Sequence, residues 1–474
     1  MRTDDKMGST NGLALAAQAA LNASPGAHLR SKLRGELVLP GDAGYEQARQ
    51  VWNGMVDKRP AMVAYCASPN DVAAAIQFAR SQGIPAAVRS GGHNIAGLSV
   101  CDGGMVIDLS RMKRIEVDRE RRIARAEAGL NLGEFDTATQ AYGLATTMGV
   151  NGDTGIAGLT LGGGFGKLGR KFGLTCDNLL AAEVVTADSR ILQASPSENA
   201  DLFWAIRGGG GNFGVVTRFD YQLHPVGPNL LAGSILHDYA HARDAMRFYA
   251  EFSSTAPDEL CLDAALVSAA SGEKYFSISV CYAGPIDEAE RVVKPLRDYG
   301  RPVEDRIAPT TYLQIQSAGD SIFPRGRRYY WKAQFLRTLT DEAIDTLLAN
   351  YANAPSVSAL IVLQQVGGAI ARVAKTATPY VNRDALYDCF PVVIWDHRAD
   401  DDAQIRWARD VWAAMRPFST GGVYANNLGD EGNDRIEAAY GENYPWLVTL
   451  KHKYDPTNFF RLNQNIRPTT STKA

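Results

Sequence analysis

From about Pro60 onward, apolar and polar positions alternate in a way that predicts mixed helices and strands. Ser68, Pro69 and Asp71 precede an apolar stripe with helical spacing, which predicts a capped helix ending near Gln82. Short apolar runs bounded by turn residues predict buried strands. The strands are expected at 85–89, 105–109, 115–117 and 213–221, with a helix at 132–142 and a hairpin over 182–192.

The pattern changes after His224-Pro225 and Gly227-Pro228, which predict a linker. Beyond it, strand-like runs alternate with helices, which indicates one sheet with helices on one face. Residues 1–34 are expected to form a loosely ordered extension, and 146–173 a glycine-rich loop. The later strands are expected at 260–269, 275–282, 359–366 and 386–395, and the helices at 286–299, 341–351 and 402–415.

Composition narrows the class of protein. The 474 residues include 45% hydrophobic and 21% charged side chains, which is ordinary for a folded chain of two or three domains. The 49 Lys and Arg nearly balance the 52 Asp and Glu, which argues against a nucleic-acid partner. Gln18 and the early acids Asp4 and Asp5 do not fit a signal peptide, and no apolar run is long enough to span a membrane. We therefore expect a cytoplasmic protein without a membrane partner.

The cysteines do not indicate a binding site, whereas the glycines do. The six cysteines include no CxxC pair, so we expect reduced, mostly buried thiols and no metal site. The 45 glycines cluster at 91–92, 162–164 and 208–211, where the backbone could approach an anion closely. Two GxGxxG strings, at 164–169 and 209–214, lack the strand–loop–helix context of a dinucleotide fingerprint, which argues against an NAD site. Tight turns alone remain the alternative explanation.

Four segments in chain order carry a family resemblance: VRSGGH at 88–93, GIAGLTLGGGFG at 155–166, RGGGGNFGVV at 207–216 and YDPTNF at 454–459. Over about residues 35–468 the chain resembles the berberine-bridge-enzyme-like FAD-linked oxidases of the vanillyl-alcohol-oxidase (PCMH-type) superfamily, including its bacterial 6-hydroxy-D-nicotine-oxidase-like members. The resemblance implies an α+β fold with a two-lobed PCMH-type FAD domain and an inserted substrate domain, an antiparallel sheet with helices on one face. The implied boundaries are an extension at 1–34, the FAD domain at 35–225, the substrate domain at 226–420 and a C-terminal return at 421–474.

The resemblance also assigns the cofactor loops. It places the first loop around the FAD pyrophosphate, the second beside the pyrophosphate and flavin, and the 214–216 backbone at the adenine end. The residues implied to bind FAD are Arg89, Ser90, Gly91, Gly92, His93, Asn94, Thr147, Gly149, Asn151, Asp153, Thr154, Gly155, Gly158, Leu159, Gly162, Gly163, Gly214, Val215, Val216, Asn463 and Asn465.

His93, one of seven histidines, is implied to bind the flavin 8α-methyl carbon covalently, which would raise the flavin potential. Taken alone, a histidine after two glycines is as readily a loop or core residue. Asn151 occupies the place where many relatives carry a second, cysteinyl anchor, so a single covalent bond is expected. Thr154, at the position that influences oxygen access, resembles in size the valine of oxygen-reactive members.

Substrate chemistry needs a proton acceptor beside the flavin. Tyr424, in a Tyr-x-Asn segment resembling the family's, is the candidate base, although most of the 19 tyrosines are expected to be packed side chains. Gln364 is expected at the same site. Asp396 and His397, adjacent in a strand, would face opposite ways and are expected at a surface or turn. Further pocket-wall candidates are Tyr329, Tyr330, Lys332 and Trp395, with Tyr330 and Lys332 on the strand face opposite Tyr329.

The resulting hypothesis is an FAD-linked oxidase of a small organic alcohol or amine, with hydride passing to flavin N5 and electrons to O₂, giving H₂O₂. Tailoring of a secondary metabolite or oxidation of an alkaloid-like compound is the setting implied by analogy. The alternative is a flavin- or ligand-binding protein that keeps the FAD cradle but lacks a productive base. A monomer or homodimer is expected.

Overall fold

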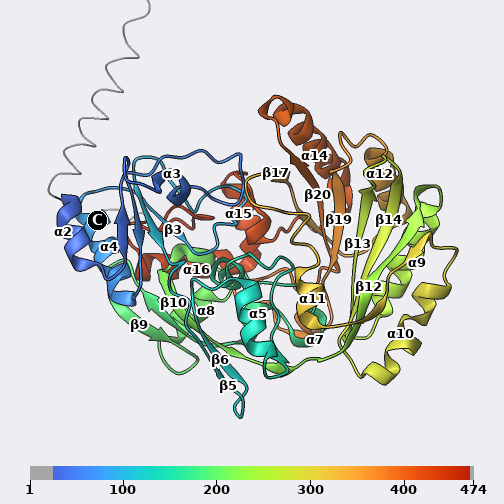
Figure 1. The fold of residues 1–474 in the computed structure, drawn as a ribbon, viewed down its shortest axis with the longest axis horizontal. Helices are drawn as coiled ribbons and strands as arrows, with labels where there is room; N and C mark the ends of the chain where they lie inside the picture. The colour runs from blue at the N-terminus through green and yellow to red at the C-terminus, as the bar shows by residue number, and fades with distance from the viewer. Residues whose placement is uncertain (1–24, 470–474) are drawn as a thin grey trace, which may run out of the picture.

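The computed structural model describes residues 25–469, an α+β assembly of sheets with four, five and nine strands and a two-stranded ribbon (Figure 1). In the first sheet β2, β4 and β3 run parallel, while β1 pairs antiparallel with β2. Helix α4 (Pro69–Ser81) begins where the Ser68 side chain accepts the Asp71 N–H, and its apolar face packs between this sheet and the second. The strands in sheet order are β1 (Glu36–Val38), β2 (Met62–Tyr65), β4 (Met105–Asp108) and β3 (Ala86–Arg89).

The second sheet is antiparallel and shares one apolar core with the first. Its fourth strand, β8, pairs with β10, and the register of this pairing shifts at two points. Helix α5 (Leu132–Gln140) starts at a capping box between Asn131 and Glu134. The strands in order are β5 (Ile115–Asp118), β6 (Ile123–Glu127), β10 (Val215–Gln222), β8 (Leu179–Val185) and β9 (Ile191–Ala194).

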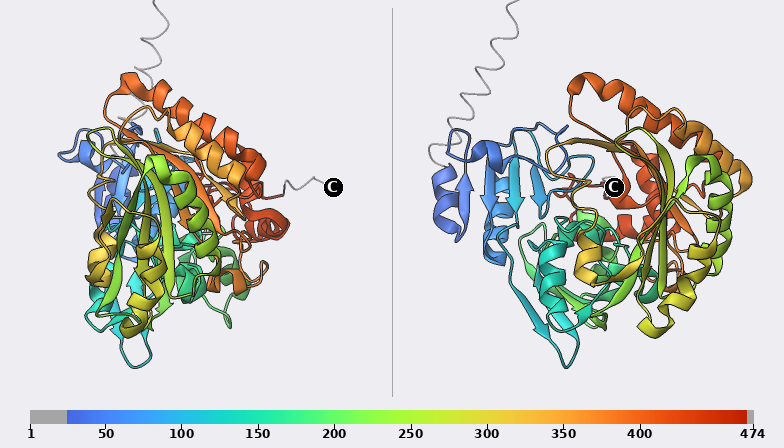
Figure 2. Two further views of the ribbon diagram at one scale, coloured as in Figure 1. Left: turned by 90° about the vertical axis from the view of Figure 1, so that its right-hand side faces the viewer. Right: turned by 45° about the vertical axis from the view of Figure 1, so that its right-hand side comes forward.

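The nine-stranded sheet is antiparallel and is covered on one face by α9 (Ala242–Thr255), α10 (Ile286–Asp298), α12 (Asp341–Tyr351) and α14 (Asp401–Met415) (Figure 2). Its other face turns toward the two N-terminal sheets. The main path is β15 (Glu304–Asp305), β12 (Leu230–Asp238), β14 (Lys274–Tyr282), β13 (Leu260–Ser268), β19 (Leu360–Gln365), β20 (Tyr387–Trp395) and β17 (Arg328–Trp331), with β16 (Ala308–Thr310) on β12 and β18 (Gln334–Leu336) on β20.

The C-terminal segment returns to the N-terminal sheets, where α16 (Tyr444–Tyr454) packs beside α8 (Ala200–Ile206). A fully buried ion pair holds this return: Lys451 Nζ lies 2.7 Å from Asp455 Oδ2 and also donates to the carbonyls of Asn212 and Phe460, each at 2.9 Å. The ammonium therefore ties the end of α16 to the glycine-rich loop before β10.

The predicted strands and helices named above are all present, with ends shifted by a few residues. Three segments differ from expectation. Part of the expected extension, 25–32, is helix α2 (Pro25–Lys32), which packs on α4 through the buried Leu29; residues 1–24 lie outside the described part. The glycine-rich loop contains the short helices α6 (Ile156–Leu161) and α7 (Gly169–Phe172). The expected linker contains β11 (His224–Pro225), which pairs with β7 (Leu144–Ala145) because backbone groups buried there need partners.

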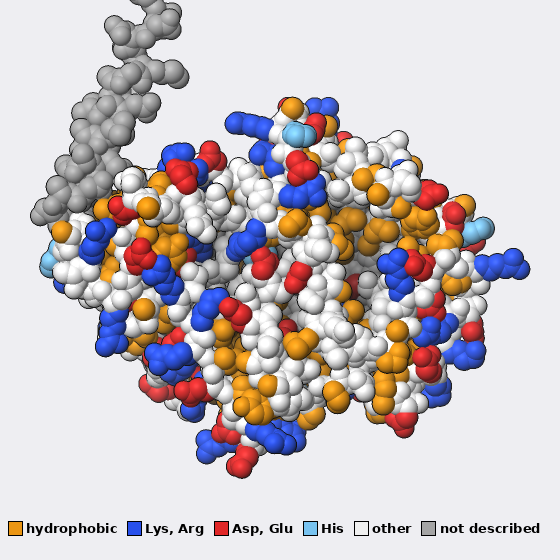
Figure 3. All heavy atoms as spheres, viewed as in Figure 1, with side chains coloured by type: hydrophobic (Ala, Val, Ile, Leu, Met, Phe, Trp, Pro, Cys, Tyr) orange, Lys and Arg blue, Asp and Glu red, His pale blue; other side chains and the backbone are white. Residues whose placement is uncertain are grey.

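Charged side chains of both signs are interspersed over the face shown in Figure 3. None of the helices within residues 25–469 has the length and apolar character needed to cross a bilayer. All six cysteines are buried and unpaired, as expected.

Candidate functional site

A cavity of about 850 Å³ lies between the glycine-rich loops and the inner face of the nine-stranded sheet, a size typical of cofactor and ligand sites. Segments distant in sequence meet there: the loops at 90–94 and 149–167, the 210–216 segment, the sheet, and the C-terminal segments at 424–427 and 460–464. We call the side built from the loops the loop wall, and the side built from the sheet the sheet wall.

The loop wall depends on glycine for close backbone contact. A Cβ on Gly91 would lie 2.3 Å from the Gly155 nitrogen, and one on Gly155 would lie 2.4 Å from the Gly91 nitrogen. A Cβ on Gly158 or Gly211 would instead meet nothing within 4 Å, although both residues line the cavity. The first pair thus locks the two loops together, whereas the second pair leaves room for a bound molecule.

Most residues expected to bind FAD line this cavity, and so do both candidate catalytic residues, Tyr424 and Gln364. The lining residues from the expected set are Ser90, Gly91, Gly92, His93, Asn94, Gly149, Asn151, Thr154, Gly155, Gly158, Leu159, Gly162, Gly214, Val215, Val216 and Asn463.

Five of the expected residues do not reach the cavity surface. Arg89 turns away from it, because its guanidinium is bound to the buried Asp108 and donates to the Ala48 carbonyl at 2.6 Å. Arg89 therefore joins strands rather than reaching an anion in the cavity. The other four are Thr147, which is fully buried, Gly163, which packs against Tyr380 and Tyr424, Asp153, which lies behind His93, and Asn465.

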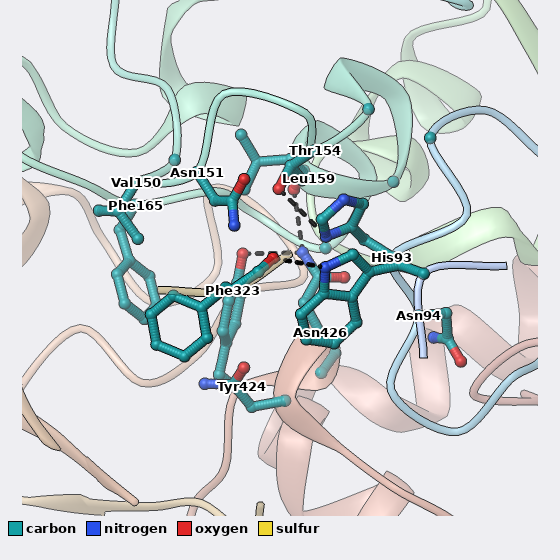
Figure 4. Close-up of a pocket in the computed structure, with 18 of the residues that line it drawn as sticks. His93, Asn94, Val150, Asn151, Thr154, Leu159, Phe165, Phe323, Tyr424 and Asn426 are labelled. Atoms are coloured by element: carbon teal, nitrogen blue, oxygen red, sulfur yellow. Dashed lines mark hydrogen bonds between the residues drawn. The ribbon is translucent and has the colours of Figure 1, made fainter. Parts of the chain in front are cut away.

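His93 lines the cavity and is held by contacts on several sides (Figure 4). Its ring stacks on Trp52 with centroids 5.0 Å apart and planes inclined by 21°. Nε2 lies 2.6 Å from Asp153 Oδ1, and Nδ1 lies 3.4 Å from Thr154 Oγ1. Burial lowers the pKa of His93, with Asp153 acting in the opposite direction, so the ring is neutral near pH 7. The imidazole is thus neutral and held in one plane.

Tyr424 is buried at the loop wall, where Figure 4 shows its hydroxyl directed toward the glycine loop. Its Oη accepts the Gly164 N–H at 2.9 Å and the Asn426 Nδ2–H at 2.8 Å. Burial raises the pKa of Tyr424, while these two donors lower it by stabilising the phenolate. Phe165 lies against its ring at a centroid distance of 4.5 Å.

The sheet wall is apolar and aromatic on the β19–β20–β17 side. It is formed there by Trp331, Val362, Phe390 and Val392, with Phe323 from the loop before β17 and Gln364 as the polar exception. Trp52, Trp331, Phe323 and Phe390 were not predicted. They belong to no motif, and only the pairing of β17 with β20 brings the strands of Trp331 and Phe390 side by side.

The remaining wall candidates lie elsewhere. Tyr330 and Lys332 share a strand face as expected, but it is the helix-covered face, where Lys332 pairs with Glu431 at 2.5 Å. Trp395 also faces the helices and donates to Asp401. Tyr329 is buried under Trp52 at a centroid distance of 3.8 Å. Asp396 and His397 are exposed, as predicted.

Asp388 is a buried acid that sequence reasoning missed. It lies on β20 opposite Gln364 and is fully buried; its Oδ2 accepts the Asn427 Nδ2–H at 2.7 Å. Oδ1 has no hydrogen-bond partner among the described residues. Burial raises the pKa of Asp388 to about 7, and its charge raises the pKa of Tyr424. An aspartate within the apolar run 386–395 was the available signal.

The cavity fits an elongated, flat anionic cofactor such as FAD. The loop wall offers backbone rather than lysine clusters, and Gly158 and Gly211 leave open space beside it. The buried Oδ1 of the lining residue Asn463 has no partner among the described residues, as expected where a ligand supplies one. The fold and cavity are therefore those of a protein that can hold a flavin-type cofactor against the loop wall, with the sheet wall facing it.

Comparison with known proteins specifies the family. The FAD binding domain family matches residues 60–195, and the berberine and berberine-like family matches 423–467. An FAD-linked oxidoreductase of Dictyostelium discoideum is 32% identical over 441 residues, covering 92% of this chain and 95% of that protein. (R)-6-hydroxynicotine oxidase of Paenarthrobacter nicotinovorans is 31% identical over 450 residues, covering 92% and 97%.

Solved structures of other proteins share this fold. The crystal structure of 6-hydroxy-D-nicotine oxidase from Arthrobacter nicotinovorans matches with a TM-score of 0.86 and 28% identity, covering 92% of this chain and 98% of that chain. A chitooligosaccharide oxidase shares the fold with a TM-score of 0.84 at 23% identity. The chain belongs to the berberine-bridge-enzyme-like FAD-linked oxidoreductases.

Proposed function

We propose that this FAD-linked oxidoreductase is an oxidase of a small, largely apolar alcohol or amine that binds in the cavity between the loop wall and the sheet wall. The observation that carries the proposal is the position of Tyr424, a buried phenol on the cavity surface whose oxygen is held by two hydrogen-bond donors. FAD supplies the two-electron acceptor, with O₂ as the final oxidant giving H₂O₂. Thr154, a small residue beside His93, supports access of O₂.

In this proposal, Tyr424 accepts the proton that leaves the substrate O–H or N–H as the adjacent C–H bond is oxidised. The Gly164 N–H and the Asn426 amide stabilise the negative charge that develops on Oη. The Gln364 amide, on the facing strand, positions the polar group of the substrate. Asp388 adjusts the basicity of Tyr424 through its charge.

We infer the substrate class from the β19–β20–β17 side of the sheet wall. Trp331, Phe390 and Val392 offer few hydrogen-bonding groups, which suits an apolar or aromatic body better than an oligosaccharide. The relative from Paenarthrobacter nicotinovorans is named as an oxidase of hydroxynicotine, a compound of this chemical class. Oxidation of alkaloid-like compounds or secondary-metabolite tailoring follows by analogy.

We further propose that FAD is attached covalently through His93, without a second cysteinyl bond. Residues 35–225 and the return at 421–474 would hold FAD, and 226–420 would form the substrate domain. The lone imidazole of His93 on the cavity surface supports this, as does Asn151 at the second position. The cavity-lining cysteines, Cys261 and Cys281, lie on the sheet wall instead.

The test is anaerobic reduction of the bound flavin by candidate aromatic alcohols and amines, followed by admission of air and measurement of H₂O₂. Tyr424→Phe should retain FAD but bleach about 100-fold more slowly than wild type, within the range for loss of a general base. Tyr330→Phe, on the helix-covered face, is the matched control and should bleach at the wild-type rate. If Tyr424→Phe bleached as fast as wild type, the proposed base would be wrong. If no substrate in the panel bleached wild type, the alternative of a non-catalytic flavin-binding protein would be favoured.

A further inference from the structure

Asp153 and Arg325, from two further loops, contact His93 and its loop without lining the cavity. Asp153, from the second glycine loop, places Oδ1 2.6 Å from His93 Nε2. Arg325, from the loop before β17, lies with Nε 3.2 Å from Asp153 Oδ2 and donates to the Gly91 carbonyl. The result is a chain of contacts from the imidazole through a carboxylate to a guanidinium carried by the substrate-side segment.

This arrangement selects one form of the imidazole. A carboxylate oxygen 2.6 Å from Nε2 repels a nitrogen lone pair and accepts but never donates a proton, so the ring proton belongs on Nε2, although the contact is not aligned as a hydrogen bond. The lone pair is then on Nδ1, whose neighbour Thr154 Oγ1 is 3.4 Å away and holds it only weakly. Trp52 fixes the ring plane from one side. The free lone pair and its direction are therefore set by neighbours rather than by His93 alone.

We propose that Asp153 is the positioning residue for covalent attachment of FAD: it holds His93 as the Nε2–H tautomer, so that Nδ1 forms the bond, and Arg325 holds Asp153 in place. This inference rests on the proposed covalent FAD and assigns its chemistry to residues of two different loops. The titratable groups facing His93 are Asp153, Arg325 and Asp320.

The atoms and electrons balance as follows. A bond forms between Nδ1 and the 8α carbon, one C–H proton leaves that carbon, and the Nε2 proton leaves the ring toward Asp153. The two electrons of the broken C–H bond reduce the flavin, which takes up the two protons, and O₂ reoxidises it to give H₂O₂. Asp153 thus also accepts the proton that the imidazole must lose.

The contacts predict how the rate of FAD attachment depends on pH. Burial acts to raise the pKa of Asp153, but His93 and, after it, Arg325 together lower that pKa below its ordinary value, so the carboxylate is ionised throughout the neutral range. The Asp153 charge in turn raises the pKa of His93. Attachment needs neutral His93 and should slow as pH falls through its pKa. Without the carboxylate that pKa is lower, so the acid limb should move to lower pH.

The experiment uses full-length wild type, Asp153→Asn, Asp153→Glu and Asp320→Asn, each freed of FAD before attachment by expression under riboflavin limitation and then supplied with FAD in air. The covalent fraction is read over time, between pH 5 and 8, from flavin absorbance in the acid-precipitated pellet. Total bound FAD is read before precipitation. Asp320→Asn is the matched control, because Asp320 is a second carboxylate near His93 whose Oδ1 accepts the Gly152 N–H at 2.7 Å, a contact that asparagine can keep.

We expect Asp153→Asn to bind FAD at wild-type stoichiometry, attach it at least 10-fold more slowly and shift the acid limb downward. Asp153→Glu should recover part of the rate, and Asp320→Asn should match wild type. Wild-type rate and pH profile in Asp153→Asn would overturn the inference while leaving covalent FAD intact. A wild-type pellet without flavin would instead overturn the proposed covalent bond itself. If Asp153→Asn does not fold, Arg325→Gln must show the slower attachment, and a wild-type rate there overturns the inference.

Discussion

The two walls of the cavity are built in opposite ways. The loop wall consists of backbone segments that approach closely at glycines, such as Gly91 against Gly155, and leaves open space at Gly158 and Gly211. The sheet wall consists of side chains on alternate positions of paired strands, such as Trp331 opposite Val392. Backbone recognition tolerates little change in sequence, whereas side chains on a strand can change without disturbing the ladder. If FAD binds the loop wall and substrate the sheet wall, as we propose, one scaffold can keep its cofactor and vary its substrate.

The largest effect should come from breaking the loop wall. In Gly91→Ala the new Cβ would meet Gly155 backbone at 2.3 Å, so the loops must separate. We expect FAD binding to fall at least 100-fold, measured by flavin titration. Gly158→Ala is the control for the fold, because its Cβ meets open cavity. Without FAD this variant should unfold at the wild-type temperature or slightly above it, because Gly158 lies inside helix α6. Equal FAD affinity in Gly91→Ala and wild type would show that the loop contact does not shape the site.

The next largest effect should come from the ion pair that anchors the loop wall to the C-terminal return. Lys451→Met leaves Asp455 buried without its partner, and loss of one partner of such a pair typically costs about 3–5 kcal/mol. The measurement is the free energy of unfolding in urea. Lys453→Met removes an exposed pair with Asp201 and should cost less than about 1 kcal/mol. Similar losses in the two variants would contradict the account.

A substitution in the sheet wall should change the oxidation of substrate rather than the binding of FAD. Phe390→Leu keeps an apolar side chain but shortens one wall of the cavity. We expect kcat/KM for an aromatic substrate to fall about 10-fold, in line with about 1–3 kcal/mol for small changes in an apolar pocket. FAD affinity should stay at the wild-type value. A matching loss of FAD would show that the walls are not separate.

The smallest effect concerns Asp388. Because burial raises its pKa from 3.8 to about 7, the native state keeps a proton that the unfolded chain releases between those values. This contribution to stability is complete below pH 3.8 and is lost as pH rises through about 7. Between pH 5 and 7, Asp388→Asn should lose less unfolding free energy than wild type, by about 1 kcal/mol or more. Parallel curves would show that Asp388 is ionised in the native state.

Asp388→Asn should also shift the pH dependence of catalysis. Removing its charge lowers the pKa of Tyr424, so the rise of kcat/KM with pH should begin at lower pH. An unchanged profile would remove Asp388 from the proposed chemistry.

The difference between the loop wall and the sheet wall also determines how much of the site could be predicted from the sequence. The loop wall was predictable because glycine requirements leave contiguous motifs, and His93 stands inside one. Arg89 belongs to the same motif, but its side chain is taken by Asp108, a partner that only folding brings near. On the sheet wall, alternation correctly paired Tyr330 with Lys332 but could not tell which face meets the cavity, and strand register alone brought Phe390 and Trp331 together.

We propose above all that the loop wall holds FAD and that His93 is bonded to it. The most direct measurement is the visible spectrum of purified wild type and His93→Ala, before and after acid precipitation. The account predicts a yellow wild-type pellet and a His93→Ala protein that binds FAD but leaves a colourless pellet. A wild-type pellet without colour, or a yellow pellet from His93→Ala, would contradict it.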